Sequence, residues 1–528
     1  MKTKVNRFIT ALLVMAMFFA LTGCSGTPAD DTNEPGTQGA STGEEIVSSK
    51  DTMTVAIDRE PQSMDPTATN ISITCTIVSQ IFDTLLDFDP DMNIIPSLAE
   101  SYEQIDDVTY KFNLRKGVKF HNGEELKASD VVFSLKRANE KPVSRAYTQE
   151  IDMEGFETPD DYTVIIRTKE PYAAFYQSLC VSRLSIVNEK ATLEAENDVN
   201  SNPVGTGPFK FASWTAGDNV TIERNDDYWG ETAKLKQVVF RIITEQSSRV
   251  VEIESGGVDA ALVLPAVDYE RLEDNGDIDL ELYTSHYVRY IAFNTTQDSL
   301  ADKRVRQALN YATDIDTIRD VLYTEKGAQK ATTPVPPGIE GRHEDLAQYD
   351  YNPEKAKELL KEAGYDNDLE ISFTYLGNTT NTLMGEMLQE QWKDVGVILT
   401  LNPLESGALT ENANNMRQEV MPVRSAYSIG EAGEGLMKLF HSSNHGPGGS
   451  RVNYTNPRVD ELLETAKVTM DENERNEMYR EVQEIVHDEA LMIYLCYEYT
   501  SVALGSKVRG FNPIPTERID YSTIYFVE

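Results

Sequence analysis

From Lys50 onward, segments with the apolar pattern of strands alternate with segments that have the pattern of amphipathic helices, and no short repeat recurs. This order of elements is typical of an α/β protein and excludes a solenoid of stacked short repeats. The predicted strands cover residues 108–114, 118–120, 164–166, 220–222 and 238–243. Because only a short break containing Lys116 and Gly117 separates the first two strands, we expect them to pair as a hairpin.

Helices are marked most clearly in the second half of the chain. Three starts carry a capping residue followed by proline or, three positions on, by glutamate: Asn352-Pro353, Asn456-Pro457 and Asp471 with Glu474. A fourth helix is indicated by a stripe of large apolar residues that we expect to be core: Met384, Met387, Leu388 and Trp392. Gly364 should end the first helix, and Gly396 should end the fourth before a strand over 397–401.

The composition fits a large folded protein with an acidic surface. The 528 residues include 87 acidic and 48 basic side chains, a formal net charge of −39, and 40% of the residues are apolar. This length is enough for roughly three to four compact units, or for two large lobes with an inserted piece. The excess of carboxylates argues against binding to nucleic acid or to anionic lipid, since both require clustered Lys and Arg.

The N-terminus predicts export. Lys2, Lys4 and Arg7 precede an apolar run over 8–21, which is the arrangement of a signal peptide and is too short for a membrane-spanning helix. We assign 1–23 to this signal, and Leu21 to Cys24 resemble a lipobox, in which Cys24 is acylated and anchors the protein to the outer face of the bacterial cell membrane. The alternative is an ordinary signal peptide with an incidental cysteine. Residues 24–50 are rich in Ser, Thr, Gly, Pro and acids, so we expect a flexible tether.

Sequence signals for catalysis or metal binding are weak. Ser41 lies in a Gly-x-Ser-x-Gly match, but no strand precedes it and no helix follows, so the match does not indicate a nucleophile. His441 and His445 are four residues apart, but they lie in a glycine-rich stretch without further ligands nearby, so we assign no metal site. We expect Cys75, Cys180 and Cys496 to be buried free thiols, with one disulfide as the alternative.

Four stretches of the chain resemble the extracytoplasmic solute-binding proteins of ABC importers, in the family 5 group for peptides, nickel and opines. They are Leu98–Ser134, Pro203–Lys210 with Asn225–Trp229, Ala292–Asn294 with Asp302–Leu309, and Ala356–Tyr365. Together with Val459-Asp460 and Arg475, they span essentially the whole chain after the tether. Most of these residues predict scaffold, with glycines at turns and Phe112, Phe120 and Phe133 in the core.

The resemblance implies a two-lobed, periplasmic-binding-protein-like α/β fold with a hinge and an extra subdomain inserted in the first lobe. We expect lobe I to comprise 51–90, 200–285 and 498–528, the inserted subdomain 91–199, and lobe II 286–497. The implied partners are a solute, ABC permease subunits with a cytoplasmic ATPase, and the lipid anchor. We expect a monomer without cofactors and without enzymatic activity.

The ligand must be inferred from residues of the cleft. Peptide-binding members of the family carry an Asp shortly after an aromatic residue, to pair with the ligand ammonium; here Gly430 stands at that position after Tyr427, and Glu431 follows. The Ser-x-Gly-Glu-Ala run resembles the glutathione-binding members. We therefore expect Arg289 and Arg424 to bind a ligand carboxylate, because guanidinium pairs are bidentate and always charged, and Tyr427, Ser428 and Glu431 to contact the ligand. For both arginines the alternative is a structural salt bridge.

The sequence thus predicts a lipoprotein that captures small peptides or peptide-like solutes, with glutathione as a candidate, and delivers them to a permease. Within the same fold, the alternative is a protein that binds nickel or a metal chelate, motivated by His441, His445 and the missing Asp. A remote alternative from another class is a secreted hydrolase, motivated by the many carboxylates and the match at Ser41.

Overall fold

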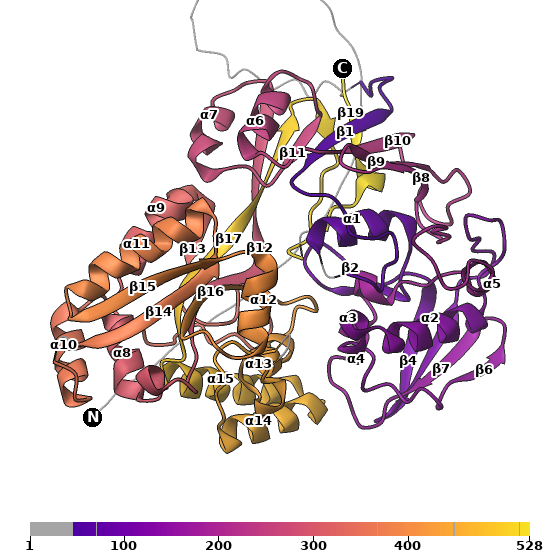
Figure 1. Ribbon diagram of the computed structural model, residues 1–528. Helices are drawn as coiled ribbons and strands as arrows, with labels where there is room; N and C mark the ends of the chain where they lie inside the picture. Colours follow the sequence, from indigo (N-terminus) through magenta and orange to yellow (C-terminus); the bar gives the residue numbers. More distant parts are fainter. Residues whose placement is uncertain (1–45, 70, 367, 447–448, 517) are drawn as a thin grey trace, which may run out of the picture. The chain divides into compact units, whose positions relative to one another are not determined.

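The computed structural model describes residues 46–69, 71–366, 368–446, 449–516 and 518–528 (Figure 1). The predicted signal 1–23, Cys24, Ser41 and most of the tether lie outside the described residues. Among the described residues, no helix is both long and apolar enough to cross a bilayer.

Eleven of the described strands form one large mixed sheet. In spatial order ten of them are β15 (Val397–Leu404), β14 (Leu369–Leu376), β16 (Val420–Ala426), β12 (Ile278–Phe293), β17 (Met492–Gly505), β11 (Ala260–Leu262), β1 (Thr52–Ile57), β10 (Gln237–Ile242), β9 (Asn219–Arg224) and β8 (Phe209–Thr215). The short β13 (Ala328–Lys330) pairs with β17 off this path. Strand β1 is parallel to both of its neighbours and β14 is parallel to β15, whereas β12 and β17 are antiparallel. Parallel pairs joined through helices confirm the predicted α/β class.

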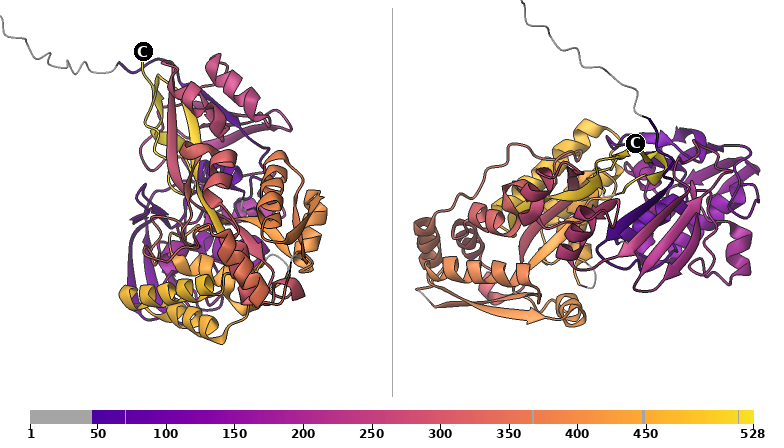
Figure 2. Two further views of the ribbon diagram at one scale, coloured as in Figure 1. Left: turned by 90° about the vertical axis from the view of Figure 1, so that its left-hand side faces the viewer. Right: turned by 90° about the horizontal axis from the view of Figure 1, so that it is seen from above.

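Two long strands, β12 and β17, lie next to each other in the middle of this sheet. The stretch of β12 over 278–284 pairs with residues 499–505, and the stretch over 288–292 pairs with residues 492–497. Between Thr284 and Val288 the register shifts, which bends a strand and breaks its ladder. Strand β17 also pairs with β11 on one side, and β12 also pairs with β16 on the other. The two lobes therefore share these strands, and the views of Figure 2 show the yellow β17 between the indigo-to-magenta part and the orange part.

A separate four-stranded sheet corrects one prediction. Its order is β4 (Ala99–Asp106), β5 (Thr109–Leu114), β7 (Thr163–Arg167) and β6 (Glu157–Asp160). Strand β5 forms where predicted, but its partners are β4 and β7, and residues 118–120 contribute only an isolated bridge from Lys119 to Glu125. The predicted hairpin is wrong because apolar alternation identifies a strand that needs burial, whereas tertiary packing selects its partner. Smaller pairs are β2 (Leu86–Phe88) with β3 (Ile94–Pro96) and β18 (Val508–Arg509) with β19 (Tyr525–Phe526).

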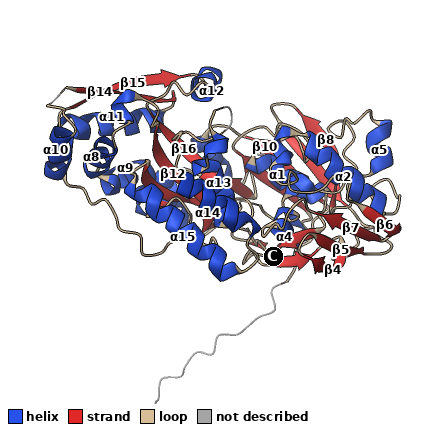
Figure 3. Cartoon of the chain, turned by 90° about the horizontal axis from the view of Figure 1, so that it is seen from below, coloured by secondary structure: helices blue, strands red, loops and turns tan. Residues whose placement is uncertain are grey.

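Helices are distributed over both lobes, as Figure 3 shows in blue. Their bounds are α1 (Ser72–Ile81), α2 (Ala128–Glu140), α3 (Pro142–Arg145), α4 (Phe175–Ser178), α5 (Glu189–Glu194), α6 (Gln246–Glu254), α7 (Tyr269–Glu273), α8 (Lys303–Tyr311), α9 (Ile315–Gly327), α10 (Pro353–Glu362), α11 (Thr379–Lys393), α12 (Ser406–Asn414), α13 (Ala432–Phe440), α14 (Pro457–Val468) and α15 (Glu472–Asp488). Helices α14 and α15 pack against each other, as do α8 and α10, and α11 packs on β15.

The predicted helix starts are confirmed at atomic detail. The side chains of Asn352, Asn456 and Asp471 accept hydrogen bonds from first-turn amides of α10, α14 and α15, at 2.9–3.0 Å. The predicted stripe on α11 is buried at Met384, Leu388 and Trp392, and Met387 packs against the same core. Gly364 and Gly396 adopt positive φ angles of 97° and 88° just after α10 and α11, a conformation that favours glycine.

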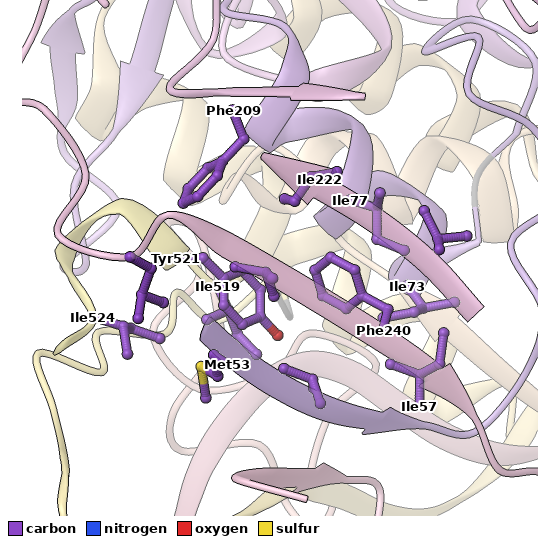
Figure 4. Packing of buried hydrophobic residues seen from close by; sticks show 14 of the residues in the cluster. Met53, Ile57, Ile73, Ile77, Phe209, Ile222, Phe240, Ile519, Tyr521 and Ile524 are labelled. Atoms are coloured by element: carbon purple, nitrogen blue, oxygen red, sulfur yellow. The ribbon is translucent and has the colours of Figure 1, made fainter. Parts of the chain in front are cut away.

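One apolar cluster fixes the position of α1 and of the C-terminal segment. Figure 4 shows residues of this cluster on β1, β9, β10, α1 and the segment after residue 518, including Met53, Ile77, Ile222, Phe240 and Tyr521. All five side chains are buried. Burying large apolar side chains of this kind stabilises a fold by about 1.5–3 kcal/mol each relative to exposure. The last residues of the chain thereby pack on the strand with which the described core begins.

Candidate ligand-binding cavity

The described residues line a cavity of about 1210 Å³. Its walls come from the start of α1, from residues of the segments 143–150 and 172–183, from β12, β16 and β17 near the register shift, and from α13. The cavity is larger than the range of about 300–1,000 Å³ that is usual for small-molecule sites. It therefore has room for a ligand of several linked residues.

Glu498, on β17 at the register shift, holds two arginines of the cavity wall together. Arg289 and Arg424 are directly opposite each other on β12 and β16, and both pair with this carboxylate, Arg424 Nε at 2.7 Å from Oε2. The guanidinium of Arg424 lies 3.4 Å from the ring centroid of Tyr287, and that of Arg289 lies 5.7 Å from the ring of Tyr323. We call Arg289, Arg424 and Glu498 the Glu498 cluster.

The two arginines of the Glu498 cluster keep the carboxyl group of Glu498 ionised. Burial alone would raise the pKa of Glu498, but the attraction of Arg289 and Arg424 is stronger and holds the pKa below its ordinary value. At neutral pH the cluster therefore contains one carboxylate between two guanidinium groups, with a net positive charge. Both predicted arginines thus line the cavity and also form a structural ion pair.

A third arginine of the wall, Arg183, is bound by neutral groups. Its Nη2 donates to the hydroxyls of Tyr147, at 2.5 Å, and Ser428, at 3.0 Å. Tyr147 in turn donates to Oε1 of Glu434, at 2.9 Å, and Oε2 of Glu434 accepts from the amides of Ser428 and Ile429. We call Arg183, Tyr147, Ser428 and Glu434, together with the nearby Lys438, the Arg183 cluster.

The Arg183 cluster joins two segments that are far apart in the chain. Arg183 and Tyr147 come from the segment 91–199, whereas Ser428 and Glu434 come from 286–497. Two further contacts cross between the same segments, an ion pair of Lys467 Nζ with Glu150 Oε1 at 3.0 Å and a hydrogen bond from the amide of Ala173 to the carbonyl of Lys467. Residues of these contacts between the two segments also line the cavity.

The other predicted site residues have different environments. Ser428 and Glu431 line the cavity, but Tyr427 is not among the lining residues. Tyr427 is 1% exposed and donates to the carbonyl of Pro334 at 2.9 Å, so it supports the wall from behind. Its role in contacting ligand stays a prediction.

Glu431 already has partners within the protein. Its carboxylate accepts from the hydroxyl of Tyr479 at 2.7 Å and lies 3.1 Å from Nε of Arg475. Burial raises the pKa of Glu431 to about 7, although Tyr479 and Arg475 act in the opposite direction. Gly430, where the resemblance predicts a carboxylate, has a φ of 71°. A second acid of this segment, Glu434, also lines the cavity and accepts hydrogen bonds from the amides of residues 428 and 429.

Sequence reasoning missed Arg183, Glu434, Lys438 and Glu498. A signal exists for Glu434, because it is the third residue of α13, and a glutamate there commonly accepts from amides before the helix. No comparable signal marks the other three. In a chain with 87 acidic residues, Glu498 is recognisable only from the arginines that the sheet places beside it.

The histidines and cysteines provide no metal site among the described residues. His441 contacts Ser443 and Glu464, whereas Nε2 of His445 lies 2.8 Å from the carbonyl of Tyr454. The described cysteines are all free, as predicted; Cys180 and Cys496 are buried, whereas Cys75 is half-buried in the cavity wall.

The lining of the cavity has the opposite charge balance to the chain as a whole. Seven basic side chains face five carboxylates: Arg59, Arg183, Arg289, Arg424, Lys438, Lys467 and Arg518 against Asp58, Glu150, Glu431, Glu434 and Glu498. In the full sequence, 48 basic residues face 87 acidic ones. A cavity that is positive inside an acidic protein favours a negatively charged ligand.

Comparisons with known proteins agree with this fold and cavity. Residues 93–447 match the model of the bacterial extracellular solute-binding proteins, family 5. The chain is 31% identical to a glutathione-binding protein GsiB of Pectobacterium atrosepticum over 472 residues, which cover 87% of this chain and 91% of that protein. The GsiB protein of Salmonella typhimurium is 30% identical over 473 residues, with 87% and 92% covered.

Solved structures show the same architecture. The periplasmic binding protein DppA of Helicobacter pylori, in complex with the peptide STSA, superposes with a TM-score of 0.80 at 27% identity, covering 92% of this chain and 99% of that one. The ABC transporter substrate-binding protein CtaP of Listeria monocytogenes gives a TM-score of 0.81 at 26% identity, covering 91% and 100%.

The two lobes, the shared strands and the charged cavity therefore define an extracellular solute-binding protein of the kind that serves ABC importers. The chain belongs to the bacterial extracellular solute-binding proteins, family 5.

Proposed function

We propose that this protein captures small peptides or peptide-like solutes, glutathione among them, in the cavity and delivers them to an ABC permease. The observation that carries the proposal is the positive lining of the cavity, seven basic side chains against five carboxylates. Glutathione carries more carboxylates than ammonium groups, so it matches this balance. The relatives named as glutathione-binding, at 30–31% identity, support the same ligand.

The site residues take the following roles in this proposal. Arg289 and Arg424 bind a ligand carboxylate by releasing part of their contact with Glu498, and Ser428 and Glu431 contact the ligand with Tyr427 behind them. These roles use charge-assisted hydrogen bonds, which are the strong ones in a site shielded from water.

Native mass spectrometry of the protein as purified tests the proposal, followed by calorimetric titration with glutathione and with di- and tripeptides. We expect a retained peptide-like mass, or micromolar or tighter binding of one of these probes. A retained uncharged sugar, with no heat from any of the peptides, would refute the proposal.

We propose further that lobe I comprises 51–90, 200–285 and 498–528, that 91–199 is the inserted subdomain and that lobe II is 286–497. The register shift between Thr284 and Val288 supports a hinge at the boundary, because bent, unpaired backbone is where strands change direction most easily. The separate sheet of β4 to β7 supports the inserted subdomain. Small-angle scattering with and without glutathione measures whether the lobes close on a ligand.

We also propose that Cys24 is acylated and anchors a monomeric protein to the outer face of the cell membrane, and that the protein performs no covalent chemistry. The lipobox-like residues 21–24 support the anchor, and the extracellular family supports the location. A Cys24→Ala variant should be recovered in the soluble extracellular fraction, whereas the unmodified chain should be recovered with membranes.

A further inference from the structure

Lys438 differs from every other basic residue that lines the cavity. Arg59, Arg289, Arg424, Lys467 and Arg518 each pair with a carboxylate, and Arg183 donates to two hydroxyls. Within the part of the chain that the structure describes, Lys438 has no hydrogen bond and no ion pair. Its side chain lies on α13 and is exposed to the cavity.

The surroundings of Lys438 carry an excess of positive charge. Although Lys438 is exposed to the cavity, the surrounding protein displaces part of its water and lowers its pKa; Glu434 partly offsets this, and Arg183 and Arg451 lower it further. Arg451 has a buried Nη1 without a hydrogen-bond partner in the described structure. Two cations and one carboxylate therefore act on Lys438, so an anion that bound here would meet positive charges that are already in place.

The nearby carboxylate cannot neutralise the group by itself. Both oxygens of Glu434 are already acceptors, one from Tyr147 and the other from the amides of Ser428 and Ile429. These bonds direct Glu434 toward Tyr147 and the amides of residues 428 and 429, and the guanidinium of Arg183 is bound by hydroxyls rather than by this acid. Hydroxyl partners satisfy the geometry of a guanidinium but not its charge.

We propose that Lys438, with Arg183 beside it, forms a subsite for a carboxylate of the ligand, distinct from the Glu498 cluster. The inference deepens the proposed function and rests on it, because it assumes a peptide-like ligand in this cavity. The arginines of the Glu498 cluster already pair with a carboxylate of the protein, whereas Lys438 has no such pair among the described residues, so the ligand would supply the carboxylate. The preferred ligands are therefore solutes with a free carboxylate at this point, and neutral esters or amides of the same solutes are poor ligands.

Binding at this subsite would also connect the two segments that meet here. Arg183 belongs to 91–199 and Lys438 to 286–497, and the hydrogen bond between Arg183 and Ser428 already crosses between them. A carboxylate shared by the two cations adds a charge-assisted contact across the same junction. Binding of the ligand would therefore stabilise the contact between the two segments.

The test is a calorimetric cycle of two proteins and two ligands: the purified protein and its Lys438→Gln variant, each titrated with glutathione and with glutathione diethyl ester. We expect Lys438→Gln to weaken glutathione binding by at least about tenfold, the size of a lost partly buried charge pair, and to change ester binding by less than about twofold. Lys438→Arg should retain most of the affinity for glutathione. Equal weakening of both ligands, or no weakening of either, would overturn the subsite.

Lys467→Gln is the matched control, because Lys467 also lines the cavity but is paired with Glu150. This variant should change the affinity for glutathione and for the ester by the same factor. If the unmodified protein binds neither glutathione nor its ester but binds trialanine, the same cycle with trialanine and trialanine amide decides the subsite. If the unmodified protein binds no peptide at all, the proposed function fails and the subsite falls with it.

Discussion

The Glu498 cluster and the Arg183 cluster lie in the wall of one cavity but neutralise their guanidinium groups differently. In the first, Arg289 and Arg424 share a carboxylate supplied by β17. In the second, Arg183 is held by the hydroxyls of Tyr147 and Ser428. In the first arrangement the guanidinium groups pair directly with a carboxylate, whereas in the second Arg183 has no direct ion pair within the described structure and Glu434 is reached only through Tyr147 and Ser428.

This difference suggests different duties for the two clusters. An internal ion pair at the register shift of β12 and β17 stabilises the strands that both lobes share, and a ligand must compete with Glu498 to use its arginines. A guanidinium held by hydroxyls is not paired with a protein carboxylate, so its positive charge can attract a carboxylate of the ligand. We therefore expect changes in the Glu498 cluster to affect mainly stability, and changes in the Arg183 cluster to affect mainly binding.

The largest expected effect is that of Glu498→Gln. The substitution leaves Arg289 and Arg424 side by side without a carboxylate, and breaking a buried ion pair in this way costs about 3–5 kcal/mol. Because the two arginine side chains retain 28% and 33% of their exposure, we expect a free energy of unfolding lower by about 3 kcal/mol, at the low end of that range. Urea denaturation at pH 7 measures it.

The pH dependence gives the control for Glu498→Gln. The pKa of Glu498 is lowered in the folded state, so its contribution is present above the unfolded pKa and is lost as the pH falls through the folded pKa. The difference in stability between the two proteins should therefore shrink progressively as the pH falls below the ordinary glutamate pKa of about 4.3. A difference of less than about 1 kcal/mol at pH 7 would mean that the ion pair is structurally dispensable.

A second effect should appear at Glu431, where one guanidinium does not overcome burial. Its pKa is raised to about 7, so the folded state binds the proton more tightly than the unfolded state, and this group lowers stability as the pH rises from about 4.5 to 7. Glu431→Gln removes that titration, so the variant should gain about 2–3 kcal/mol relative to the unmodified protein between pH 4.5 and pH 8. Parallel stability profiles of the two proteins would contradict the raised pKa.

Much of the scaffold could be predicted because its signals are local. Asn352, Asn456 and Asp471 lie directly before the helices that they cap, and the apolar stripe of α11 needs only helical spacing to be recognised. The partner of β5 could not be predicted in this way. Its pairing with β7 joins residues 50 to 58 positions apart, and that choice depends on how the whole subdomain buries its apolar faces.

The cavity shows the same limit more sharply. Arg289 and Arg424 were predictable from the resemblance, and the sheet places them opposite each other on adjacent strands. The contact of Arg183 with Ser428 joins residues 245 positions apart, so no local pattern contains it. A tertiary contact of this kind becomes visible only when the fold has brought the two segments together.

A third prediction concerns Tyr147, which links a cation and an anion of the Arg183 cluster. Its hydroxyl accepts from Arg183 and donates to Glu434, and hydrogen bonds to charged groups contribute about 1.5–3 kcal/mol. Because other acceptors remain for Arg183, we expect Tyr147→Phe to lower the free energy of unfolding by about 1–2 kcal/mol and to weaken glutathione binding. Urea denaturation and calorimetry measure the two effects. If both the free energy of unfolding and the affinity for glutathione were unchanged, the hydrogen bonds of Tyr147 would contribute to neither stability nor binding.

The smallest effect should come from the matched change at Tyr323, beside the Glu498 cluster. This ring lies 5.7 Å from the guanidinium of Arg289, but its buried hydroxyl has no hydrogen-bond partner among the described residues. Tyr323→Phe keeps the ring and removes only an unsatisfied polar group, so stability should be unchanged within about 0.5 kcal/mol or slightly raised. Urea denaturation beside the Tyr147→Phe variant makes the comparison. A loss above about 1 kcal/mol would reveal a partner for the Tyr323 hydroxyl, and both clusters would then depend on hydroxyl contacts.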